Sequence, residues 1–158
     1  MRKIKEIVIH CSAGKWGNVK FIDKIHKERG FNQIGYHFVI NNGLTTYNDY
    51  KNNNIIEEFD GLLEKGRSEN IKGAHVKNHN KYSIGICLIG LDKFTTKQFE
   101  TLTILIGNLL KKYKLDISDV RGHYEYDTAI LQGKTCPNFD VNCYRNELYL
   151  LKEIGDIL

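Results

Sequence analysis

The chain has 158 residues, four of them cysteine, and a formal net charge of +4 at neutral pH. This length suffices for one hydrophobic core, so a single domain is expected. No apolar stretch could cross a bilayer and no signal core follows the charged first residues, so we expect no membrane insertion and no secretory signal. The mild positive charge suits an anionic polymer or simply a solvated surface, and we expect no nucleic acid as partner. Without export, reduced thiols, one of them a metal ligand, are favoured over disulfides.

Short apolar runs predict the strands of the fold. Buried strands are expected at residues 4–10, 36–40 and 83–89, and a shorter one at residues 120–122. The second of these runs is closed by the turn Asn41-Asn42-Gly43. Helical patterns separate the strands, which indicates an α/β domain with a largely parallel or mixed sheet.

Apolar residues at helical spacing predict three helices. The first covers residues 19–29 and the last covers residues 140–158, which offers one apolar face to the core. The longest begins at a capping box formed by Thr95 and Gln98 and runs to about Tyr113. No internal repeat and no domain boundary interrupts this pattern.

Residues 47–70 do not fit a minimal domain of this class. The segment is polar and rich in Asn and Lys, with a short amphipathic piece near residues 55–63. Two interpretations remain open, a small extra helix over a binding groove and a plain surface excursion, and we favour the excursion.

Three residues far apart in the chain have the chemistry of a metal site. His10 ends the first predicted strand, His123 follows the short strand at 120–122, and Cys136 precedes the single proline of the chain. Two imidazoles and one thiolate can hold zinc and leave the fourth tetrahedral position open for water, as catalytic zinc sites do. Residue types alone also permit a buried inert thiol and backbone-bonded core histidines. The positions at strand ends favour a site, because functional residues gather where strands stop and loops begin.

Four blocks of sequence, in a fixed order, resemble a known family. They are Ile9-His10-Cys11-Ser12; Gly35-Tyr36-His37-Phe38; Gly73-Ala74-His75-Val76 with Ser83-Ile84-Gly85-Ile86; and Gly122-His123 with Lys134-Thr135-Cys136-Pro137-Asn138-Phe139-Asp140. The chain resembles the zinc-dependent N-acetylmuramoyl-L-alanine amidases of the peptidoglycan-recognition superfamily, and most closely the small bacteriophage lysozyme-type amidases. Each block is modestly specific, but four in order span nearly the whole chain.

The resemblance implies a fold, a reaction and a set of site residues. The implied fold is a central mixed β-sheet flanked by helices, and the implied reaction is hydrolysis of the amide between N-acetylmuramic acid and L-alanine in peptidoglycan. One zinc ion per chain is expected on His10, His123 and Cys136, where it would lower the pKa of bound water to roughly 7. Lys134 is expected to stabilise the oxyanion electrostatically, and Tyr36 to orient the water or pass its proton.

Several physiological roles agree with such an enzyme. We expect a monomeric phage endolysin that accumulates in the host cytoplasm and acts on the cell wall after release. A cytosolic amidase that recycles soluble muropeptides is the alternative enzyme. A module that binds peptidoglycan without cleaving it is disfavoured, because such superfamily members typically lose the cysteine ligand and Cys136 is present. Some phage members also bind and inhibit an RNA polymerase, and the sequence favours neither outcome.

Two segments depart from the compact phage pattern. The loop at residues 124–135 is longer than in the smallest members, and residues 47–70 resemble an insertion after the second strand. Because a longer loop adds little to the free-energy cost of closing it, we expect the zinc ligands of this chain to be those that the resemblance implies. The resemblance does not determine which substrates are preferred, since both segments could border the substrate-binding groove.

The other histidines and cysteines are expected outside the metal site. His37 should be structural because on a strand it would point away from Tyr36. His75 and His79 fit either the substrate groove or an exposed loop, and His26 fits the surface of a helix. The remaining thiols are expected to point away from the zinc or to lie in the core: Cys11, Cys87 and Cys143.

Overall fold

The computed structural model describes residues 2–155, and a five-stranded sheet is its centre. The strands are β1 (Glu6–Cys11), β2 (Phe38–Asn42), β3 (Asp60–Lys65), β4 (Ser83–Leu88) and β5 (Val120–Gly122). Their spatial order is β3-β2-β4-β1-β5. β3 pairs with β2 in antiparallel fashion, whereas the other neighbours are parallel. The expected single domain with a central mixed sheet is confirmed.

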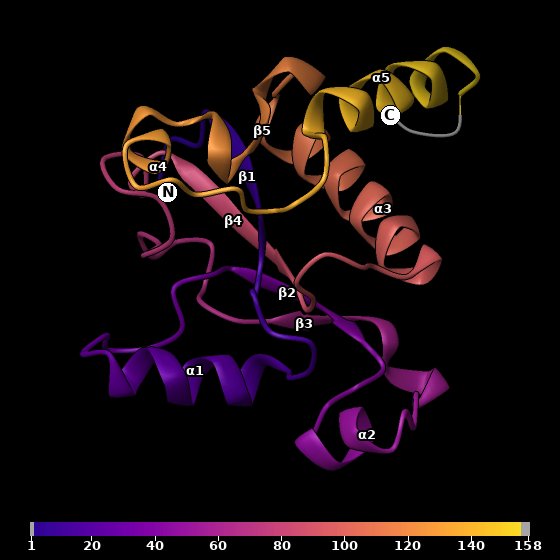
Figure 1. Ribbon diagram of the computed structural model, residues 1–158. Coiled ribbons are helices and arrows are strands. Elements are labelled where there is room, and N and C mark those ends of the chain that lie inside the picture. Colours follow the sequence, from indigo (N-terminus) through magenta and orange to yellow (C-terminus); the bar gives the residue numbers. More distant parts are fainter. Residues whose placement is uncertain (1, 156–158) are drawn as a thin grey trace.

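Helices cover both faces of this sheet. They are α1 (Val19–Glu28), α2 (Tyr47–Lys51), α3 (Thr96–Tyr113), α4 (Asp127–Ile130) and α5 (Val141–Glu153), with 3₁₀ turns η1 (Glu57–Phe59), η2 (Ile117–Asp119) and η3 (His123–Glu125). α3 and α5 lie on one side of the sheet and α1 lies on the other (Figure 1). No helix within residues 2–155 combines the length and the apolar character that crossing a membrane requires.

The hydrophobic core is divided unequally by the sheet. Alternate residues of β1 and β4, such as Ile7, Ile9 and Ile86, point toward α3 and α5 and are fully buried there with Leu102 and Ile106. Each such aliphatic side chain contributes about 1.5–3 kcal/mol on burial. The cluster under α1 is smaller. The face of the sheet toward α1 therefore has room for polar residues at its strand ends.

The N-terminus of α3 is tied to three strands through the predicted capping box, which is confirmed. The Thr95 hydroxyl accepts from the Gln98 amide at 3.1 Å, and the Gln98 side chain accepts from the Thr95 N–H at 3.0 Å. The fully buried side-chain amide of Gln98 also donates to the carbonyls of Ile40 in β2, at 3.0 Å, and of Ile89 directly after β4, at 2.9 Å. Thr95 donates to the Asp60 carboxylate of β3 at 2.6 Å. One residue pair therefore links the helix to β2, β4 and β3.

The interpretation of residues 47–70 as a surface excursion is wrong in part. The piece near residues 55–63 is not a helix; it passes from the 3₁₀ turn η1 into β3, an edge strand of the sheet. β3 has one neighbour and several exposed side chains, so it lacks the apolar alternation that marks a half-buried strand. Whether the segment is additional to the family's minimal fold stays a prediction.

Other element boundaries shift by a few residues. β2 begins at Phe38, so Tyr36 stands before the strand rather than in it. The last helix ends at Glu153, and Ile154 is 70% exposed, so the predicted apolar face ends earlier than expected. The predicted end of that helix at residues 156–158 lies outside the described residues.

We expect Gln98→Ala to destabilise the fold strongly. The change removes the side-chain bond that caps the Thr95 N–H and leaves the Ile89 carbonyl without the Gln98 donor, whereas the Ile40 carbonyl keeps its bond from the Ile89 N–H at 2.9 Å; the loss should cost about 2–4 kcal/mol. Lys97→Ala is the matched control, because Lys97 makes only a surface ion pair with Glu57 and should cost less than about 1 kcal/mol. Urea unfolding of the three proteins measures both values. Equal stability of the two variants would contradict the role of Gln98.

Candidate metal centre

The parallel pairing of β1 with β5 places two histidines side by side. Ile9 of β1 is in register with Gly122 of β5, and the next residues along the two strands are His10 and His123. Their ring centroids are 4.6 Å apart. Both rings lie at the carboxyl ends of parallel strands, where open α/β sheets commonly bind ligands.

Cys136 joins the two histidines through backbone contacts. The amide of Tyr124, next to His123, donates to the Cys136 carbonyl at 2.9 Å. The amide of Cys11, next to His10, donates to the Cys136 sulfur at 3.1 Å. This sulfur lies 3.8 Å from Nδ1 of His10, and the ligand atoms of the three residues all lie within 4.8 Å of one another. The structure thus brings together the three residues that the sequence analysis selected.

The electrostatic environment keeps the imidazoles neutral. His10 is 1% exposed, and this burial lowers its pKa well below the ordinary value, with the neighbouring His75 and His123 lowering it further. Burial also lowers the pKa of His123, and the charge of Lys134 adds to that effect. Neutral imidazoles expose a lone pair, as metal coordination requires.

The Cys136 sulfur needs a cation to become a thiolate. Contact with the Cys11 thiol raises the pKa of Cys136, and burial raises it further. A buried charge of this kind is stable only when it is paired. A metal ion bound to the sulfur would provide the pairing charge and deprotonate the thiol.

The donor set fits zinc. Zn–N bonds of about 2.0–2.1 Å and Zn–S bonds of about 2.3 Å put two tetrahedral nitrogen ligands roughly 3.3–3.4 Å apart and a nitrogen and a sulfur ligand roughly 3.6 Å apart. The 3.8 Å between Nδ1 of His10 and the Cys136 sulfur is close to that N–S spacing. His123 and Cys136 are only half-buried, so the centre is open on one side, as a catalytic zinc site has to be.

The two predicted catalytic side chains border the same centre. The Tyr36 ring lies 5.1 Å from the His10 ring, and burial raises the pKa of its phenol well above the ordinary value, as do the nearby thiols. Tyr36 is therefore a hydrogen-bond donor at neutral pH. Lys134 is exposed, two residues before Cys136, and its charge reaches His123.

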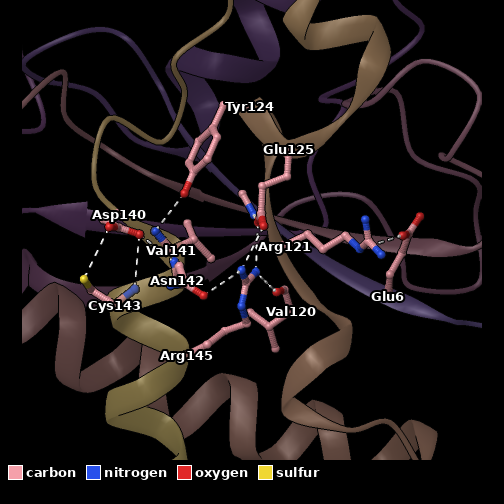
Figure 2. A network of polar contacts seen from close by, with 11 residues as sticks. Glu6, Val120, Arg121, Tyr124, Glu125, Asp140, Val141, Asn142, Cys143 and Arg145 are labelled. Atoms are coloured by element: carbon pink, nitrogen blue, oxygen red, sulfur yellow. Dashed lines mark hydrogen bonds and ion pairs between the residues drawn. The ribbon is translucent and has the colours of Figure 1, made fainter.

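A polar network holds the turn that carries His123 (Figure 2). The Glu125 carboxylate accepts from the Gly122 amide at 2.6 Å and makes two hydrogen bonds of 2.9 Å with the Arg145 guanidinium. Arg145 of α5 also donates to the Val120 carbonyl of β5 at 2.8 Å. Partial burial by itself raises the pKa of Glu125, but the bonds from Arg145 and Gly122 outweigh it, so the net pKa is below the ordinary value.

Several expectations for the other residues need correction. His26 is not on the surface: it is buried, and its Nδ1 accepts from the Gly35 amide at 2.9 Å. Cys143 is exposed rather than in the core, whereas Cys87 is buried as expected. His37 is buried and its Nδ1 accepts from the Gly85 amide, in agreement with a structural role, and its ring lies 5.6 Å from that of His75.

His75 is the contact that the sequence reasoning missed. Its Nδ1 lies 2.9 Å from Nε2 of His10, although 65 residues separate the two in the chain. The motif Gly73-Ala74-His75 is the only sequence signal for this histidine, and it does not indicate which residue His75 contacts. Only the fold shows that the partner of His75 is the candidate ligand His10.

Comparison with known proteins identifies the family. A model of the N-acetylmuramoyl-L-alanine amidase family matches residues 1–139 of the chain. The chain belongs to this family. The match confirms the expected reaction class: this amidase hydrolyses the amide bond between N-acetylmuramic acid and L-alanine.

Individual relatives agree with the family match. The amidase is 35% identical over 155 residues to the endolysin of Escherichia phage T7, covering 90% of this chain and 87% of that protein. It also resembles the solved structure of the N-acetylmuramoyl-L-alanine amidase LysC from Clostridium intestinale, with a TM-score of 0.72 and 27% identity over 94% of this chain and 87% of that one. The Drosophila peptidoglycan recognition protein PGRP-LB shares the fold, with a TM-score of 0.62 and 24% identity over 89% of this chain and 85% of that one.

The Glu125–Arg145 pair should make the amidase's stability depend on pH. Because folding lowers the pKa of Glu125, its carboxylate stabilises the fold fully above the unfolded value of about 4.3, and this contribution is lost as pH falls through the folded-state pKa. Glu125→Gln should therefore lower the free energy of unfolding near neutral pH, by an amount that shrinks below about pH 4.

Urea titrations from neutral to acidic pH measure this difference. Glu147→Gln is the matched control on α5, because Glu147 is exposed and should alter stability little at any pH. A difference between wild type and Glu125→Gln that stays constant across the acidic range would contradict the role of the ionised Glu125.

Proposed function

We propose that the amidase acts through one zinc ion held by His10, His123 and Cys136. The observation that carries the proposal is the convergence of two neutral imidazoles and a thiol within 4.8 Å at the carboxyl ends of β1 and β5. When bound, zinc supplies a Lewis acid for the scissile carbonyl and an acidified water.

Two side chains of the chain complete the proposed reaction. Tyr36 keeps its phenolic proton and lies against His10, where it orients the attacking water by donating or accepting a hydrogen bond. The oxygen of the scissile carbonyl becomes negative as water adds to the carbon, and the positive charge of Lys134 stabilises this oxyanion electrostatically. The C–N bond then breaks, and the proton lost by the water leaves with the amine of L-alanine.

We infer that the amidase works on the bacterial cell wall as a phage endolysin. Support comes from its relatives in phages T7 and KP32, which are named endolysins and of which this chain covers 87% and 90%. Peptidoglycan is the substrate in this proposal, and a muropeptide-recycling amidase is the second candidate. Cytoplasmic accumulation before release and a monomeric state belong to the proposal, and binding to an RNA polymerase stays open to a pull-down.

Product analysis tests the reaction and the metal together. Purified protein incubated with Gram-negative sacculi should release stem peptides that begin at L-alanine, detected by mass spectrometry. A zinc chelator should abolish the release, and added zinc should restore it. Release that survives complete metal removal would contradict the zinc proposal.

The same assay separates the two physiological candidates. Soluble anhydromuropeptides offered beside intact sacculi provide the comparison. Faster cleavage of sacculi is expected for an endolysin. Cleavage confined to the soluble fragments would identify the recycling enzyme instead.

Cys136→Ala should lose both zinc and activity, because two imidazoles alone bind zinc weakly. Cys143→Ala removes another thiol at an exposed position and should keep both. Zinc content by elemental analysis and peptide release are the two measurements. Full zinc occupancy in Cys136→Ala would exclude Cys136 as a ligand.

Lys134→Ala should keep zinc but lose turnover by roughly 10²–10³-fold, the usual effect of removing one oxyanion-stabilising group. Lys111→Ala, an exposed lysine on α3, controls for the loss of one positive charge. Zinc loss in Lys134→Ala, or equal activity of the two variants, would show that the role assigned to Lys134 is wrong.

A further inference from the structure

The imidazole of His75 occupies the side of His10 that faces away from Cys136. Nε2 of His10 lies 2.9 Å from Nδ1 of His75, and the two rings are nearly perpendicular, at 86° with centroids 5.0 Å apart. Nδ1 of His10 lies instead 3.8 Å from the Cys136 sulfur. The two nitrogens of the candidate ligand therefore have different partners, one in the metal site and one behind it.

Chemistry assigns the direction of the hydrogen bond between the rings. If Nδ1 of His10 offers its lone pair to a metal, the proton of the neutral ring is on Nε2, which donates to His75. Nδ1 of His75 then accepts, and the proton of that ring is on Nε2, 3.3 Å from the Ser83 hydroxyl. Ser83 in turn donates to the His79 carbonyl at 3.0 Å. A carbonyl can only accept, so the whole chain of bonds has one consistent direction.

The ring of His75 packs directly against two glycines, at positions where any side chain would collide with it. A Cβ added at Gly85 of β4 would lie 2.6 Å from Cγ of His75, and one added at Gly73 would lie 2.5 Å from Cδ2. The backbone amides of His75 and Val76 both donate to the Asn80 side chain, at 2.7 and 3.0 Å. The packing therefore holds the imidazole in one place and one orientation.

We propose that His75 is a positioning residue of the metal centre: its Nδ1 accepts a hydrogen bond from the Nε2–H of His10 and thereby fixes the rotation and the tautomer of that ligand. The proposal rests on the proposed zinc function. Metal-binding histidines normally donate their second ring N–H to an oxygen acceptor, and removing that acceptor typically weakens metal affinity by 10–100-fold. Here the acceptor is a second neutral imidazole, anchored through Ser83 to the backbone.

Zinc affinity tests the proposal without relying on activity. In competition with a chromophoric chelator, His75→Ala should bind zinc roughly 10–100-fold more weakly than wild type. His75→Asn places an amide oxygen near the position of Nδ1 and should restore most of the affinity. His75→Gln places its oxygen farther along the side chain and should restore little. His79→Ala removes a nearby histidine that pairs with Glu6 and should leave zinc affinity unchanged.

The melting temperature of each chelator-treated variant controls for folding. Wild-type affinity in a folded His75→Ala would overturn the proposal, as would equal losses in His75→Ala and a folded His75→Asn. A wild-type protein that binds no zinc would instead contradict the proposed function. These failures are therefore distinguishable.

A spectroscopic measurement on the wild-type protein covers the case in which the variants do not fold. Long-range ¹H–¹⁵N correlation spectra of the zinc-loaded enzyme should show His10 protonated at Nε2 and His75 protonated at Nε2. Protonation of His75 at Nδ1 would overturn the proposal, because that nitrogen could then not accept from His10.

Discussion

Strand β1 is hydrogen-bonded on both edges, to β4 along its whole length and to β5 over three residues. Side-chain alternation sends Ile7 and Ile9 into the core under α3 and α5, and sends His10 to the opposite face. A shift of one residue would exchange the two faces and place the imidazole among aliphatic side chains. The register that buries the isoleucines is therefore also the register that orients the candidate ligand.

The candidate ligand His10 and the groups around it are uncharged at neutral pH. Burial lowers the pKa values of His10 and His123 and raises that of Tyr36, so all three are uncharged at neutral pH. Lys134 is a fixed positive charge at the exposed rim. In the proposed reaction, a cation bound among these uncharged groups would act on the scissile carbonyl from within the site, and Lys134 would act from its solvent-exposed edge. The low polarity of the site is thus part of its chemistry.

Features that depend on a short stretch of sequence can be predicted from the sequence alone. His10 and His123 stand at the ends of apolar runs, and the capping box at Thr95 is a local pattern, so these were predicted from short segments. The role of Cys136 needed the family resemblance, because an isolated thiol in a loop is ambiguous. β3 was missed because an edge strand exposes too much of its surface to show alternation. His75 was missed because its partner is distant in sequence and no periodicity links the two.

The bond between the Cys11 amide and the Cys136 sulfur spans 125 residues of chain. Contacts of such separation form late in folding, because the entropy of closing a long loop has to be offset by other interactions first. During synthesis, the two imidazoles leave the ribosome before the thiol that completes their set. The proposed metal centre can therefore be assembled only after Cys136 has been synthesised and has returned to the first strand, so a chain that ends before residue 136 would lack one of the three proposed ligands.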